Sequence, residues 1–187
     1  MTYYKAVRPD LSSFHDPSFF YTVGKRVRPQ PYDGHRELCG PGVLHASERP
    51  EDAVRYARWP WRILTVEGKP FVTQSDKCGF RQLTVVGEVA RHVPFGPQGV
   101  LVERLVVRAE ALTRAEATEL HAARYVAWDA AWTAAGDAAW DVARDAAGYV
   151  AVSDLIGQHG LTEQHIRTLY QPWQQVIGEP DIEELLA

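Results

Sequence analysis

The chain has 187 residues, of which 45% are hydrophobic and 24% are charged, and its formal net charge is −4. This length and composition indicate one globular domain, or one domain with a helical appendage. The acidic balance argues against broad electrostatic capture of nucleic acid, and no segment approaches the roughly 18 apolar residues of a membrane helix. We therefore expect neither a membrane nor a nucleic acid as partner.

The N-terminus has no basic segment followed by an apolar core, so we expect no signal peptide. The two cysteines, Cys39 and Cys78, make no disulfide framework. Reduced thiols and the missing leader together predict a cytoplasmic protein. With His35 and His45, the cysteines match no familiar ligand spacing, so we expect no metal site.

The first part of the chain is predicted to be rich in short strands. Runs of apolar, β-branched and aromatic residues alternate with Gly, Pro and Asp, which end strands. The expected strands cover residues 3–7, 19–23, 42–46, 61–67, 71–73, 81–90 and 100–107. We expect them to build a mixed α/β domain over residues 1–107.

A strand-to-helix corner lies within this part. The apolar strand at 42–46 ends on polar groups, and a helix is predicted directly after it, at residues 50–57. Ser47 is a suitable N-cap, Pro50 is tolerated in the first turn, and the acidic residues after Pro50 suit the positive end of the helix dipole. Small ligands are often held at such corners.

The character of the chain changes near residue 112. Thr113 and Glu116 form a capping-box pattern, and an alanine-rich helix is predicted to run from there to about residue 152. A second capped helix is predicted over 162–177, with an apolar face that includes Ile166, Leu169, Trp173 and Val176. We expect a helical region over residues 108–187 that packs on the first domain. The expected fold class is therefore α+β.

Three tryptophans in the long helix share one row. Trp128, Trp132 and Trp140 are spaced by multiples of four residues, next to rows of alanine. Such a face packs closely against another helix or a sheet. Alternatively, exposed tryptophans would anchor a protein partner.

The corner residues resemble a known family. The block Pro41-Gly42-Val43-Leu44-His45-Ala46-Ser47, followed by Ala53 and Tyr56-Ala57, is similar to a corner of ADP-ribosyltransferase-like domains. In that group a basic first strand, a His/Ser strand and a late strand with a glutamate follow one another along the chain. Here these strands carry Lys5 and Arg8, then His45 and Ser47, then Glu88.

The resemblance implies an NAD-using transferase or NAD hydrolase. Glu88 and His45 would be catalytic, with the Glu88 carboxylate stabilising the positive charge that develops on the ribose when the glycosidic bond breaks. Four residues would bind the cofactor: Lys5, Arg8, Ser47 and Tyr56. Tyr56 would stack on the nicotinamide, and Arg8 would hold a phosphate. If the resemblance holds, we expect His45 and Glu88 to lie on neighbouring strands and their side chains to line one hollow.

A second resemblance covers residues 3–90. The pattern Cys-x-x-Gly-x-x-His-Ala-Ser at residues 39–47 looks like that of an uncharacterised domain family from phages and actinobacteria. The Ser-Thr-Ser triplet of the transferases is His45-Ala46-Ser47 here, and no second Glu or Gln lies two residues before Glu88. The alternatives are therefore a degenerate relative that binds a nucleotide, a nucleotide- or nucleic-acid-processing enzyme with another reaction, or a non-catalytic phage or mobile-element accessory or immunity-type protein. The last would bind its partner through the tryptophan row.

Overall fold

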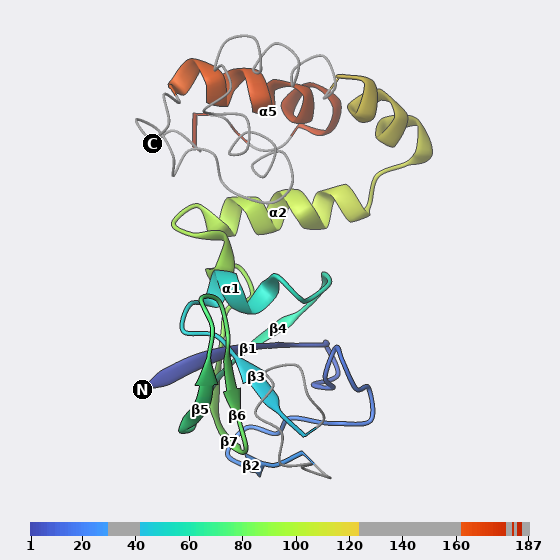
Figure 1. Cartoon of the computed structure of the whole chain (residues 1–187). Coiled ribbons are helices and arrows are strands. Elements are labelled where there is room, and N and C mark those ends of the chain that lie inside the picture. Colours follow the sequence, from blue (N-terminus) through green and yellow to red (C-terminus); the bar gives the residue numbers. More distant parts are fainter. Residues whose placement is uncertain (30–41, 124–161, 179–180, 182, 185–187) are drawn as a thin grey trace. The chain divides into compact units, whose positions relative to one another are not determined.

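The computed structural model describes residues 1–29, 42–123, 162–178, 181 and 183–184. The chain divides into two compact units, Met1–Pro94 and Phe95–Ala187 (Figure 1). The first unit is built from antiparallel strands and the second contains helices, so the predicted α+β class is confirmed. The boundary between these units follows Pro94, whereas the first domain was expected to end at residue 107.

The first unit contains two antiparallel sheets. The larger sheet has the strand order β1-β4-β7-β2 and the smaller has the order β3-β6-β5. The larger sheet comprises β1 (Thr2–Val7), β4 (Arg62–Glu67), β7 (Leu83–Val89) and β2 (Arg26–Val27). The smaller sheet comprises β3 (Leu44–Ala46), β6 (Cys78–Phe80) and β5 (Pro70–Thr73).

The core of this unit draws side chains from both sheets. Tyr3 and Val7 of β1 cluster with Leu64 of β4 and with Phe80 of β6, and the rings of Tyr3 and Phe80 meet edge to face with centroids 4.8 Å apart. Successive side chains of a strand point to opposite faces, so Lys5 shares the core face of β1 with Tyr3 and Val7. A lysine on this face is the first unusual feature of the fold.

The two sheets meet where β1 passes the end of β3. The Tyr4 N–H donates to the Ser47 carbonyl at 2.7 Å, and the Ser47 N–H donates to the Tyr4 carbonyl at 2.9 Å. This pair continues the pairing direction of an antiparallel ladder beyond the end of β3. It brings the strand that carries Lys5 beside the strand that carries His45.

Most expected strands are confirmed, but the one at 19–23 is wrong. Only an isolated bridge between Ser12 and Phe20 forms there. Side-chain hydrogen bonds hold the segment as loop instead, because the Asp10 carboxylate accepts from the N–H and hydroxyl of Ser12, and the Asp16 carboxylate does the same for Ser18. Short polar side chains that bond to nearby backbone compete with strand pairing in this way.

The corner helix is shorter than expected and is capped differently. Helix α1 spans Pro50–Val54, with Pro50 at its start and two acidic residues in its first turn, as predicted. Its N-cap is Arg49, which makes no side-chain capping bond, so the assignment of Ser47 as N-cap is wrong. Ser47 is buried because strand pairing with Tyr4 extends past β3.

The second unit begins with a helix where a strand was expected. The 3-10 helix η1 (Val93–Phe95) is followed by α2 (Gly99–Glu110), which includes residues 100–107. Its buried residues are Gly99, Leu101, Val102 and Leu105. Their spacing is that of a helix face, so the β-branched content of the segment was a weaker signal than its period.

Both predicted helix starts in the second unit are confirmed. The Thr113 N–H donates to Glu116 at 2.8 Å and the Glu116 N–H donates to the Thr113 hydroxyl at 3.2 Å, and residues 114–123 are helical. Helix α5 (Glu163–Ile177) starts at a capping box of Thr162 and His165 and ends before Gly178, whose φ is 72°. A left-handed φ favours glycine at a helix end.

The buried face of α5 differs in part from the expected one. Its buried residues are Ile166, Tyr170, Pro172 and Ile177, whereas Leu169, Trp173 and Val176 are half-buried. The tryptophan row of Trp128, Trp132 and Trp140 lies outside the described residues. Its proposed role as a partner surface therefore stays a prediction.

Candidate functional site

Lys5 places a positive charge against the core of the first unit. Its side chain is half-buried, and its ammonium nitrogen lies 5.6 Å from the centroid of the Tyr21 ring, which is itself buried. Burial removes water from the ammonium group and lowers the pKa of Lys5 to about 8. The cation–π contact with the Tyr21 ring compensates part of the solvation energy that the Lys5 ammonium loses. An anion bound beside Lys5 would compensate the remaining desolvation cost of its ammonium group.

His45 lies in the middle of β3, and several positively charged groups affect its pKa. It pairs across the ladder with Gly79 of β6, which contributes no side chain there. Burial first, and then the positive charges of Lys5, Lys77 and His15, lower the pKa of His45 to about 4. The imidazole is therefore neutral at pH 7. We call Lys5, His15, His45 and Lys77 the basic corner.

Tyr56 stands beside this corner. Its hydroxyl donates to the Asp76 carboxylate at 2.6 Å, and the Lys77 ammonium lies 4.3 Å from the centroid of its ring. The hydrogen bond raises the pKa of Tyr56 and lowers the pKa of Asp76. Asp76 and Lys77 belong to the turn between β5 and β6, and Cys78, which follows this turn, pairs with Ala46 next to His45.

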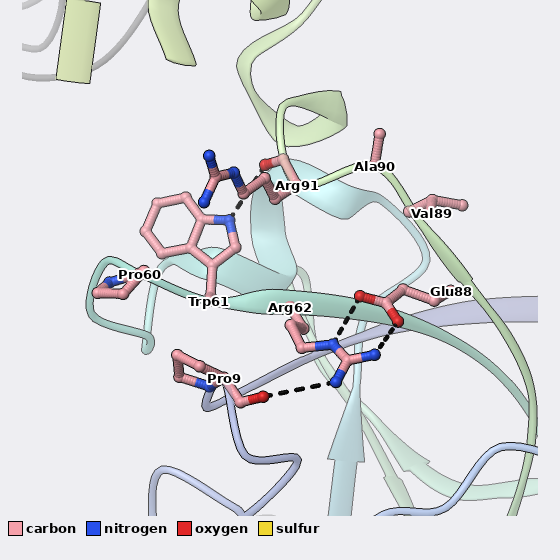
Figure 2. A pocket seen from close by; sticks show the side chains of 8 residues that line it. All are labelled: Pro9, Pro60, Trp61, Arg62, Glu88, Val89, Ala90 and Arg91. Carbon is pink, nitrogen blue, oxygen red and sulfur yellow. Dashed lines mark hydrogen bonds and ion pairs between the residues drawn. The ribbon is translucent and has the colours of Figure 1, made fainter. Parts of the chain in front are cut away.

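Glu88 lies in a separate hollow of the first unit (Figure 2). The hollow is open and has a volume of about 590 Å³; it is lined by Pro9, Pro60, Trp61, Arg62, Glu88, Val89, Ala90 and Arg91. Both Glu88 oxygens accept from Arg62, at 2.8 Å from Nε and 2.5 Å from a terminal nitrogen. The remaining terminal nitrogen of Arg62 donates to the Pro9 carbonyl at 3.4 Å. These bonds to Arg62 lower the pKa of Glu88 and keep it ionised.

The expectation that His45 and Glu88 come from neighbouring strands is wrong. His45 is in the smaller sheet, and Glu88 is on β7 of the larger sheet. The smaller sheet meets the larger one at β1, and β4 separates β1 from β7. The hollow that contains Glu88 is lined by neither His45 nor Lys5. The catalytic roles of the two residues stay predictions, but they do not share this hollow.

The other predicted site residues divide in the same way. Lys5 and His45 belong to the basic corner, and Tyr56 contacts it through Lys77. Ser47 adjoins the corner through its backbone bonds to Tyr4. Arg8 instead donates to the Phe14 carbonyl at 3.4 Å, and its guanidinium lies 5.8 Å from the Phe14 ring centroid. The loop at 10–20 thus holds Arg8.

Three residues were not predicted as part of either site. Arg62 could have been found, because it alternates with Leu64 and Val66 and so had to lie on the core face of its strand. His15 and Lys77 sit in turns, where a charged residue is unremarkable in sequence. Only the pairing of β3 with β6 and of β3 with β1 brings them toward His45.

The comparisons with known proteins concern the first unit. Residues 1–93 match the family described as Domain of unknown function (DUF7666). The match ends one residue before the boundary between the two units, and it supports the expected uncharacterised domain family for the N-terminal unit. No match was found among curated proteins or among solved structures. The likeness to ADP-ribosyltransferases therefore rests on the residues quoted above.

Two further findings concern the described part of the chain. None of its helices is long and apolar enough to cross a membrane. Within the same residues, no group of three or more His, Cys, Asp or Glu side chains is placed to hold a metal ion.

Proposed function

We propose that the N-terminal unit binds a nucleotide at the basic corner, with NAD as the first candidate, and does not use Glu88 to cleave it. The lysines and imidazoles of the corner would hold the phosphates. The unit would then be a relative of ADP-ribosyltransferase-like domains that keeps ligand binding. The observation that carries this proposal is the strand pairing that brings Lys5, His45 and Lys77 to one junction, because Tyr4 pairs with Ser47 and Ala46 pairs with Cys78.

Placing the basic groups Lys5 and His45 in partly buried positions makes their protonated forms less stable. Lys5 and His45 both have lowered pKa values, so both are harder to protonate than in water. A phosphate group would reverse this cost, because its negative charge favours the protonated forms of nearby lysine and histidine. Groups with strongly perturbed pKa values on neighbouring strands are therefore candidates for a binding site.

The pairing of Glu88 argues against cleavage. A carboxylate that stabilises an oxocarbenium-like ribose must offer its negative charge to the substrate. In this chain Arg62 compensates that charge through two hydrogen bonds. We therefore assign Arg62 and Glu88 to the fold and the basic corner to the ligand.

Calorimetry on the full chain with NAD tests the binding. We expect Lys5→Met and Lys77→Met each to weaken NAD binding about tenfold, which is the ordinary effect of losing one charge-assisted contact. Lys69→Met is the matched control, since Lys69 is an exposed lysine in the turn between β4 and β5. An affinity that none of the corner variants changes, or no binding of NAD by the native chain, would overturn the proposal.

An NAD-consumption assay tests the second half of the proposal. We expect the native chain and Glu88→Gln to leave NAD equally intact over the same incubation. If the native chain consumes NAD and Glu88→Gln does not, Glu88 is catalytic and must leave Arg62 during the reaction.

A further inference from the structure

Tyr56 is the most exposed large aromatic side chain of the described first unit. It has a relative exposure of 61%, compared with 54% for Phe20. Exposed aromatic rings usually move freely, because nothing fixes them in one rotamer. Tyr56 differs because two neighbours hold it.

The two restraints act on different parts of the ring. The hydroxyl is held at one edge by its 2.6 Å hydrogen bond to Asp76. One face lies under the Lys77 ammonium, 4.3 Å from the centroid. The opposite face then accounts for the exposure of the residue. A ring that is both exposed and fixed loses little side-chain entropy when a planar ligand stacks on it.

The charges around the ring favour a neutral base. The hydrogen bond from Tyr56, and also the positive charges of Lys77 and Arg55, lower the pKa of Asp76, so the negative charge beside the ring is already compensated and would not attract a cation. Lys77 already draws on the π-electrons of Tyr56, and a second cation on the other face would gain less from them. The nicotinamide ring of NAD is such a cation. A purine is neutral, and its two fused rings cover more of the tyrosine face than one ring does.

We infer that Tyr56 is the stacking platform for the purine base of the bound nucleotide, and not for the nicotinamide. This inference rests on the proposed function. The base would stack on the solvent-facing side of Tyr56, and the phosphate would reach the basic corner through Lys77. The ligand class is then a purine nucleotide, including the adenosine half of NAD.

Two mononucleotides separate the purine from the nicotinamide. AMP and nicotinamide mononucleotide each carry one ribose and one phosphate, so they differ in the base alone. We expect Tyr56→Leu in the full chain to weaken AMP binding about tenfold, as expected for one stacked base, and to change the affinity for nicotinamide mononucleotide less than about twofold. Calorimetry measures both.

Two variants control for the restraints and for general effects. Tyr56→Phe keeps the ring and loses the bond to Asp76, so most of the AMP affinity should remain. Phe20→Leu removes another exposed aromatic ring of this unit and should leave both ligands unaffected. Circular dichroism of each variant checks that the chain is folded.

The outcomes separate this inference from the proposed function. If Tyr56→Leu leaves AMP binding unchanged while Lys5→Met weakens it, the platform is wrong and the basic corner stands. Loss of nicotinamide mononucleotide binding in Tyr56→Leu, equal to or greater than the loss for AMP, overturns the purine preference. If neither mononucleotide binds the native chain, the proposed function fails and the inference fails with it.

Discussion

The basic corner and the hollow at Glu88 differ in whether their charged groups have partners of opposite charge. In the hollow, Arg62 joins Glu88 and the Pro9 carbonyl, so one side chain ties together β4, β7 and the end of β1. At the corner, burial lowers the pKa of Lys5, and burial together with nearby positive charge lowers the pKa of His45. In the hollow, the charges of Arg62 and Glu88 compensate each other, so the pair stabilises the fold. The arrangement at the corner costs stability, and a cost of this kind is typical of a binding site.

Removing Arg62 should have the largest effect on stability. Arg62→Met removes the two donors of the exposed Glu88 carboxylate and the bond to the Pro9 carbonyl, and we expect the free energy of unfolding to fall by about 1.5 kcal/mol. Denaturant unfolding at pH 7 measures it. A matched Arg28→Met variant removes an exposed arginine that bonds Gln82 and should cost less. Equal losses would mean that the hollow does not tie the sheet together.

Replacing Lys5 should act in the opposite direction. Lys5→Met removes a charge from the core face of β1 and keeps an apolar chain of similar length, so we expect stability at pH 7 to rise by about 1 kcal/mol. Because the folded pKa is about 8 and the ordinary value is 10.5, the native chain gains stability as the pH rises between these values. The advantage of Lys5→Met should therefore shrink over this window. An advantage that stays constant would refute the burial of a charge at this position.

His45 should make the first unit sensitive to mild acid. Its pKa is about 4 in the folded chain and 6.5 ordinarily, so the unfolded chain binds more protons between these values. We expect the native chain to lose about 1 kcal/mol more than His45→Gln on going from pH 6.5 to pH 4, since part of the imidazole remains in water. Thermal melts at several pH values measure the difference. Parallel curves would show that protonation of His45 costs nothing.

Tyr56 should matter least for stability. Its contacts with Asp76 and Lys77 are at the surface, so we expect Tyr56→Phe to change the free energy of unfolding by less than about 0.5 kcal/mol. The same urea titration used for Arg62→Met compares the two directly. A loss as large as that of Arg62→Met would place Tyr56 with the residues that hold the fold.

Local patterns in the sequence were sufficient for many elements. Runs of apolar, β-branched and aromatic residues predicted β1, β4 and β7, and the capping boxes at Thr113 and Thr162 marked two helix starts. Each depends on residues within one strand or one turn, where spacing alone decides which side chains meet. The segment at 100–107 shows the limit of this approach. Its β-branched residues favoured a strand, and the packing of Leu101, Val102 and Leu105 made it a helix.

For the candidate site, the sequence by itself indicated Lys5, His45 and Tyr56 as candidates, and it missed His15 and Lys77. Only the tertiary structure decided which of them meet. Sheet order placed β4 between β1 and β7, and so it separated Glu88 from His45 and gave it Arg62 as partner. Strand pairing joins segments that lie far apart in the chain, and the spacing of residues along one segment does not determine its neighbours.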